Sequence, residues 1–308
     1  MKKIVIALAA LALTAGIASA QDLNAALEVY NNALAQSEDD KAAALDGLKN
    51  ALKLGEALGE EGNDLVANCK SAIPALMLSL AKAQINDANY DKALEMLAET
   101  EAVANEYENG DVLIDIPDLY VNVYNRRGSK YFNEKNFAPA LEDLAKVVEA
   151  DPTDGKTFLK IAMAQQVLGD VDAAVESYKK AAENGNEAAA NKRLGSIFIA
   201  KGQALQKAGK NAEAIEAYET AMGYVENAGV YKVIGNLHTK LGKSAAANEA
   251  YKKYLELKPN APDADGVKYT IAVNAQKLGD KATAKAFYSQ LLSNAEYAAE
   301  AKKQLGAL

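Results

Sequence analysis

Few residues in this sequence have the type and spacing needed for catalysis or metal binding. His238 is the sole histidine and Cys69 the sole cysteine among 308 residues, and neither has sequence neighbours that complete a catalytic triad or a zinc site. No phosphate-binding glycine loop or nucleophile elbow occurs. We therefore expect His238 to be a packed, hydrogen-bonded side chain and Cys69 to be a semi-buried structural thiol. A lone cysteine forms no disulfide within the chain, and pairing between molecules stays open.

Carboxylates are the other candidates for chemistry. The stretch ENGDVLIDIPD, residues 108–118, carries Asp111, Asp115 and Asp118 and reads as a loop or irregular insertion that ends at Pro117. An enzyme would have to build its site here, because acidic residues elsewhere on a helical protein usually form a solvated face. The sequence predicts a protein that is not an enzyme, with no catalytic residues, no cofactor and no metal.

The first residues have the pattern of an export signal. Lys2 and Lys3 precede an apolar run of about a dozen residues that ends in Ala18, Ser19 and Ala20. The run is shorter than the roughly 18 to 20 apolar residues of a membrane-spanning helix. We expect residues 1–20 to be a signal peptide cleaved before Gln21, which places the protein in the periplasm or outside the cell. No cysteine follows the cleavage point to carry a lipid anchor, so no stable membrane insertion is expected.

The charge of the chain narrows the choice of partners. The net charge is −8, and loss of the two lysines of the signal peptide makes it more negative. Nucleic acid and anionic lipid are bound through clustered cations and would be repelled at long range. We therefore expect neither as a partner.

The sequence pattern predicts helices throughout. Alanine, leucine, lysine and glutamate dominate after residue 21, apolar residues recur at helical spacing, and no alternating strand pattern is convincing. A skeleton of glycine, alanine, an aromatic residue and a small residue recurs at intervals of roughly 33 to 47 residues. Its small residues let two helices approach, its tyrosines fill the space towards the next pair, and its glycines close turns. These structural positions are Gly128, Ala140, Gly169, Ala174, Tyr178, Gly209, Ala214, Tyr218, Gly235, Gly242, Ala247, Tyr251, Gly279, Ala284 and Tyr288.

On these residues the chain resembles the tetratricopeptide repeat family. The resemblance implies an all-α fold, a right-handed superhelical solenoid of helix hairpins in which neighbouring hairpins bury one another. We expect a divergent helical capping region at residues 21–70, about six repeat units at 71–293 with the insertion near 108–118, and a capping helix at 294–308. With its Ala-Ser-Ala-Gln junction, the chain resembles exported envelope proteins of Bacteroidota that carry these repeats.

The resemblance also implies a binding surface. In this family the concave groove, lined by the first helix of each repeat, often receives a peptide. Repeat position places ten residues in the groove: Asn122, Asn125, Arg126, Ser129, Lys156, Lys160, Gln203, Lys232, Asn236 and Gln276. Lys232 and Asn236 match the first two positions of the family's carboxylate clamp, but Thr270 breaks the pattern at the next. We expect a scaffold that binds a protein or peptide partner in the cell envelope.

Three alternatives remain open at this stage. Tyr107, Tyr120, Tyr124, Tyr131 and Phe132 cluster near the insertion and could stack on a sugar, although aromatic residues at helical spacing are usually core. Glycan binding is therefore one alternative function. Self-association into a structural scaffold is another, because Leu305 and Leu308 could join copies end to end. The third is that the many polar residues of the groove are ordinary solvated side chains.

Overall fold

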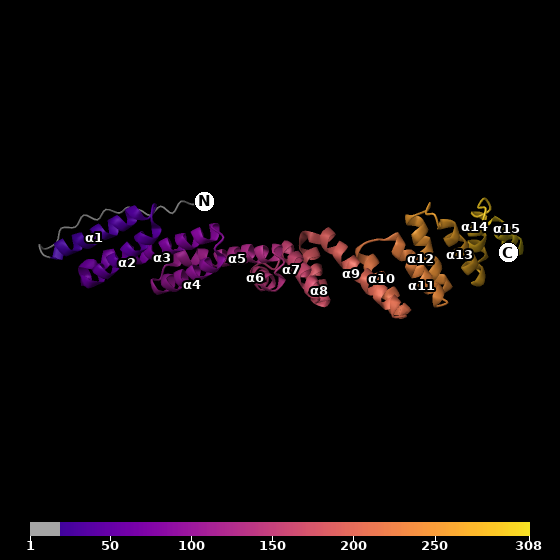
Figure 1. The fold of residues 1–308 in the computed structure, drawn as a ribbon, viewed down its shortest axis with the longest axis horizontal. Coiled ribbons are helices and arrows are strands. Elements are labelled where there is room, and N and C mark those ends of the chain that lie inside the picture. Colours follow the sequence, from indigo (N-terminus) through magenta and orange to yellow (C-terminus); the bar gives the residue numbers. More distant parts are fainter. Residues whose placement is uncertain (1–18) are drawn as a thin grey trace. The chain divides into compact units, whose positions relative to one another are not determined.

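The computed structural model describes residues 19–308, and the polypeptide there is helical from end to end (Figure 1). In this part of the chain no β-strand is present. The predicted all-α fold of helix hairpins is confirmed. The signal peptide predicted for residues 1–20 lies outside the described residues, apart from its last two positions.

The described residues divide into two compact units, and the division passes through helix α7. The N-terminal unit runs to Thr153 and includes residues 163–170, and the C-terminal unit comprises residues 154–162 and 171–308. The first unit contains α1 (Ser19–Gln36), α2 (Lys41–Ala57), α3 (Asn63–Asn86), α4 (Tyr90–Glu106), α5 (Gly110–Asn133) and α6 (Phe137–Ala150). After α7 (Gly155–Leu168), the second contains α8 (Val171–Ala181), α9 (Glu187–Lys207), α10 (Asn211–Tyr224), α11 (Ala228–Lys240), α12 (Ser244–Leu257), α13 (Ala264–Lys277), α14 (Lys281–Ser289) and α15 (Ala298–Ala307).

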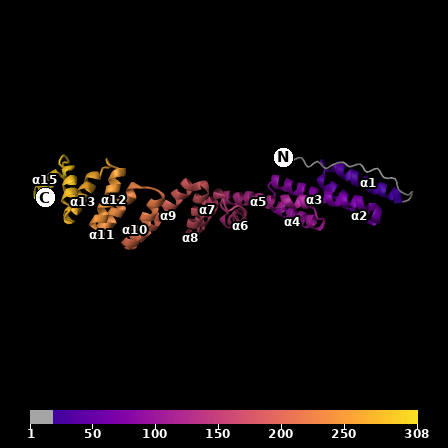
Figure 2. The ribbon, with the colours of Figure 1, turned by 180° about the vertical axis from the view of Figure 1, so that it is seen from behind.

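In the N-terminal unit each helix packs chiefly on its neighbours in the sequence (Figures 1 and 2). Helices α1 and α2 form one hairpin, α3 and α4 a second, and α5 and α6 a third. Two clusters of buried apolar residues run between them, one from α1 to α3 and one from α3 to α5. A hairpin buries its apolar face only against the next hairpin, so the core is continuous along the chain.

The C-terminal unit follows the same rule. Consecutive helices from α8 to α15 pack on one another, with the tightest pairs being α9 with α10, α11 with α12, and α13 with α14. Buried tyrosines mark the second helix of each of these pairs, namely Tyr218, Tyr251 and Tyr288, and Tyr178 is buried on α8 in the same way. Helix α9, with 21 residues, is longer than α11 and α13, the first helices of the next two pairs.

The turns inside the hairpins depend on left-handed backbone. Gly169, Gly209, Gly242 and Gly279 have φ values between 71° and 89°, a region that costs a residue with a side chain about 1–2 kcal/mol. Ala88 and Lys135, inside hairpins, and Glu108, between α4 and α5, have left-handed backbone without glycine, with φ values between 53° and 62°. Glycine therefore marks the turn after α7 and the later hairpin turns, but not these three earlier ones.

Gly235 shows why small residues are needed between paired helices. A Cβ added to it would lie 2.5 Å from Cε1 of Tyr251, well inside van der Waals contact. Tyr251 is 4% exposed, and its hydroxyl donates to Oδ1 of Asn236 at 2.8 Å. The Tyr251 ring of α12 thus packs directly on Gly235 of α11, and this contact requires a residue without a side chain there.

The prediction of a loop at residues 108–118 is wrong, because this stretch begins α5. The Asn109 side chain caps the helix by accepting from the Val112 amide at 3.2 Å, and Val112 and Ile116 are buried one turn apart. Proline inside a helix costs about 3 kcal/mol, so the burial of this apolar face offsets the presence of Pro117.

The two predicted limits of the repeat region fall at different kinds of place in the structure. The limit between residues 70 and 71 falls inside α3, and the region before it is a full hairpin, with α1 as the first-helix partner of α2. At the other end, α15 lies within the predicted capping segment 294–308. Leu305 and Leu308, expected as candidates for self-association, are half-buried and pack on the cluster formed by α13 and α14. None of the helices described here combines the length and apolar character needed to span a membrane.

Candidate protein-binding surface

Helix α5 presents a buried face and a polar face. Val123 is fully buried and Gly128 is also buried, packed on Asp143 and Leu144 of α6. Residues at helical spacing on the other face stay accessible, as expected for an amphipathic helix. They include four of the ten predicted groove residues: Asn122, Asn125, Arg126 and Ser129.

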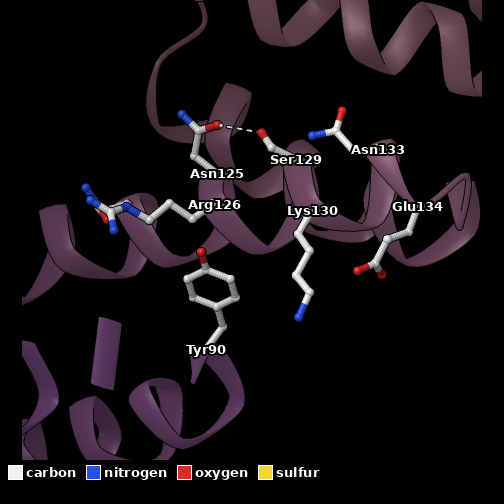
Figure 3. Close-up of a pocket in the computed structure, with 8 residues that line it drawn as sticks. Tyr90, Asn125, Arg126, Ser129, Lys130, Asn133 and Glu134 are labelled. Atoms are coloured by element: carbon white, nitrogen blue, oxygen red, sulfur yellow. Dashed lines mark hydrogen bonds between the residues drawn. The ribbon is translucent and has the colours of Figure 1, made fainter. Parts of the chain in front are cut away.

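These four side chains line an open hollow of about 560 Å³, which we call the α5 pocket (Figure 3). Figure 3 shows Asn125, Ser129 and Asn133 on one side of α5, and Lys130 and Glu134 on the side where Tyr90 approaches from α4. Ser129 Oγ donates to Asn125 Oδ1 at 3.3 Å. The full lining is Tyr90, Asn122, Asn125, Arg126, Ser129, Lys130, Asn133 and Glu134.

The charge of the α5 pocket is opposite to that of the chain. Arg126 and Lys130 are both exposed, and neither forms an ion pair with any described residue. Together with Glu134 they give the pocket a net positive charge on a chain of net charge −8. Amide side chains beside them can donate to and accept from a peptide backbone without demanding a particular side chain.

A second hollow of about 460 Å³, the Arg127 pocket, shares Tyr90 and Lys130 with the α5 pocket. Arg127 Nε and Nη2 each donate to a carboxylate oxygen of Asp143 at 2.8 Å, and Nη1 pairs with Asp91. Hydrogen bonds to Asp143 contribute most to raising the pKa of Arg127. The other lining residues are Gln84, Ala88, Asn89, Lys92 and Tyr131.

Lys232, Asn236 and Gln276, also predicted to line the groove, hold internal contacts in the C-terminal unit. Lys232 pairs with Asp263, which also accepts a hydrogen bond from Tyr254. Asn236 accepts from Tyr251, and Gln276 accepts from the Tyr288 hydroxyl at 3.0 Å while donating to Gln304 at 2.8 Å. These three side chains therefore serve the fold of the C-terminal unit.

The other three predicted groove residues lie on α7 and α9. Lys156 and Lys160 are one turn apart on α7, with Lys156 exposed and Lys160 half-buried, and Gln203 is exposed on α9.

Sequence reasoning missed four residues of the α5 pocket: Tyr90, Lys130, Asn133 and Glu134. Lys130 and Asn133 follow Arg126 by four and seven residues, so helical spacing alone could have found them. Tyr90 belongs to the preceding helix and no local pattern connects it to α5.

The single histidine and the single cysteine differ in their surroundings. His238 is half-buried, and its Nδ1 is buried without a hydrogen-bond partner among the described residues, so the expectation that it is hydrogen-bonded does not hold for this atom. Burial lowers its pKa. Cys69 is fully buried, and burial raises the pKa of its thiol to about 12. A buried thiol of high pKa is unreactive and cannot meet a second molecule without unfolding.

The carboxylates singled out as an alternative active site do not converge. Asp111, Asp115 and Asp118 are exposed on α5, and Asp115 pairs with Lys82 of α3 at 2.8 Å. Within residues 19–308 no group of histidine, cysteine and acidic side chains is arranged to hold a metal ion. The aromatic residues near the predicted insertion are half-buried, and Tyr120 stacks on Tyr124 with ring centroids 6.3 Å apart.

Family models for the tetratricopeptide repeat match residues 121–154, 156–184, 195–224, 228–261 and 267–295, which together make about half of the chain. Heat shock protein STI1 of Saccharomyces cerevisiae is 33% identical over 95 residues, which cover 31% of this chain and 14% of that protein. Photosystem I assembly protein Ycf3 of Prochlorococcus marinus is 32% identical over 103 residues, which cover 32% of this chain and 60% of that protein. The chain thus spans less than two thirds of the length of either relative.

Solved structures similar to this chain include the MamA protein, with 22% identity and a TM-score of 0.29 over 61% of this chain and 94% of that one. A thermophilic repeat protein of Thermus thermophilus has 19% identity and a TM-score of 0.26 over 59% of this chain and 95% of that one. The repeat skeleton, the stacked hairpins and the matches to the family models agree: this chain belongs to the tetratricopeptide repeat family.

Proposed function

We propose that this protein is an exported, non-enzymatic scaffold that binds a segment of a partner protein in the cell envelope through the α5 pocket. The observation that carries the proposal is the gathering of Asn122, Asn125, Arg126 and Ser129 on one accessible face of α5. Amides there can satisfy the partner's backbone, and Arg126 can attract its acidic side chains. A preformed pocket on a packed helix lowers the entropy cost of ordering the partner.

The names of the two relatives fit a scaffold. One is a heat shock protein and the other an assembly protein. Export rests on the amino-terminal sequence pattern, so the mature protein isolated from its own cells should begin at Gln21. Intact-mass measurement of the isolated protein tests this, and a retained residue 1 would contradict it.

The binding surface is tested by removing its cations. The double variant R126Q and K130Q should recover less of the partner from envelope extracts, with at least a threefold loss, because it removes two charges without touching the core. Quantitative mass spectrometry of the co-purified proteins gives the readout. Lys49 and Lys53 of α2 are also exposed and four residues apart, so K49Q with K53Q makes the same charge change elsewhere and should leave recovery unchanged. Equal recovery with both double variants would contradict the proposal.

A further inference from the structure

Arg127 occupies a position that is a buried isoleucine in three other hairpins. It lies directly before the small residue of its helix, Gly128, and three residues after an aromatic. The residues before three equivalent small residues are Ile161, Ile234 and Ile271, all buried, whereas the residue before the fourth, Gly202, is an exposed lysine. A charge at such a position must be matched by an opposite charge and hydrogen bonds.

Asp143 supplies that match on one side of the guanidinium. Its side chain is 4% exposed, and it accepts two hydrogen bonds of 2.8 Å from Nε and Nη2 in a bidentate pair. Bidentate pairs of this kind are the strongest that arginine makes with a carboxylate. Asp143 is therefore the structural partner that fixes Arg127 between α5 and α6.

Nη1 faces a different kind of partner. It pairs with Asp91, which lies in the first turn of α4. The side chain of Asp91 is 82% exposed. An exposed ion pair contributes little to folding because both charges keep access to water and salt. Asp91 can therefore leave Nη1 without opening the core, whereas Asp143 cannot.

Two lysines lie in the same pocket as this exposed pair. The Arg127 pocket also contains Lys92 and Lys130, and it continues into the α5 pocket through Tyr90 and Lys130. Lys92 is engaged with Glu95 at 2.7 Å, while Lys130 makes no ion pair with a described residue. An acidic side chain of a partner lying along the α5 pocket would thus reach Nη1 with Lys130 beside it.

We infer that Nη1 of Arg127 is a carboxylate-binding site that Asp91 occupies in the free protein, and that a carboxylate of the bound partner displaces Asp91. The exchange keeps the charge at Arg127 balanced, because one carboxylate replaces another and Asp91 becomes solvated. Asp91 acts as a built-in competitor for Nη1, so that only a carboxylate held in register by the α5 pocket displaces it. This inference rests on the proposed function. It adds that the partner carries a carboxylate, and that Asp91 regulates its binding by competing for Arg127.

Three synthetic peptides with a fluorescent N-terminal label test the site on the full chain. Labelled Ala-Glu-Ala-Glu-Ala-amide offers side-chain carboxylates, Ala-Gln-Ala-Gln-Ala with a free C-terminus offers a terminal one, and Ala-Gln-Ala-Gln-Ala-amide offers none. D91N should tighten binding of a carboxylate-bearing peptide about two- to fivefold, the range expected when an exposed ion pair no longer competes. The first two peptides distinguish a side-chain from a terminal carboxylate, and the third should bind neither protein.

D87N is the matched control, because Asp87 is an exposed acid in the turn before α4 and its replacement changes the net charge equally. It should leave the affinity within twofold of the wild type. The ¹⁵N side-chain resonances of Arg127 should also move when the carboxylate peptide is added, a change that a purely structural Arg127 would not show. Equal effects of D91N and D87N, an unmoved Arg127 resonance, or no binding to D91N at millimolar peptide would each overturn the inference. Arg126 lines the α5 pocket but not the Arg127 pocket, so partner recovery with R126Q alone tests the proposed function and distinguishes its failure from failure of this inference.

Discussion

Neighbouring residues of α5 have opposite roles. Arg126 is exposed and makes no ion pair with a described residue, whereas Arg127 is fixed by Asp143 and flanked by Tyr124 and Tyr131, whose ring centroids each lie 6.0 Å from its guanidinium carbon. One step along a helix turns a side chain by about 100°, so adjacent arginines point to solvent and to the core. Helical spacing reveals that difference in the sequence, but the partners Asp91 and Asp143 come from other helices and become apparent only in the structure.

Asp263 gives the C-terminal unit an acid-sensitive contact. Hydrogen bonds from Lys232 and then from Tyr254 hold its pKa below the usual range. A carboxyl whose pKa is lower in the folded state stabilises the protein above the unfolded value of about 3.9, and that stability is lost as the pH falls through the folded value. Because Asp263 is 40% exposed, the effect should be no more than about 1 kcal/mol.

Replacing Asp263 by asparagine therefore should lower the midpoint of urea unfolding at pH 7 and have a smaller effect at pH 3. Circular dichroism at both pH values measures this. The same difference between variant and wild type at the two values would show that the carboxylate's charge is not responsible.

At the scale of elements, glycine predicted hairpin turns correctly where the turn needs a left-handed residue and the chain supplies a glycine. Gly169, Gly209, Gly242 and Gly279 predicted four hairpin turns, and each has the left-handed backbone that glycine favours. The same signal failed at the earlier turns, which use Ala88, Glu108 and Lys135. It also misled at residues 108–118, because proline and glycine suggested a loop while burial of Val112 and Ile116 supports a helix.

Lys135, in the turn between α5 and α6, provides a test of this view. Its φ of 62° strains a residue with a side chain, so K135G should raise the free energy of unfolding by up to about 1 kcal/mol. K135A keeps the Cβ and should change it little, whereas G242A, at φ 71°, should lower it by about 1 kcal/mol. Equilibrium urea unfolding provides all three values. A K135G variant less stable than K135A would contradict the strain argument.

At the scale of the whole molecule, each unit is a chain of neighbour contacts. Helices pack on the helices before and after them, and the core passes from hairpin to hairpin. Such an arrangement leaves one helix face per hairpin free for ligands, since no distant element covers it. Repeat position was enough to place four pocket residues on one face of α5, but it could not separate them from Asn236 and Gln276, whose internal partners lie on neighbouring helices.

Site-specific photocrosslinking tests the central claim, that the α5 pocket receives the partner, most directly. A photoreactive amino acid at Asn122, which lines the pocket, is compared in living cells with one at Glu149, which is exposed on α6 and lines neither the α5 pocket nor the Arg127 pocket. Position 122 should yield a discrete protein adduct that R126Q with K130Q weakens, and position 149 should not. Adducts of the same proteins at equal yield from both positions would contradict the account.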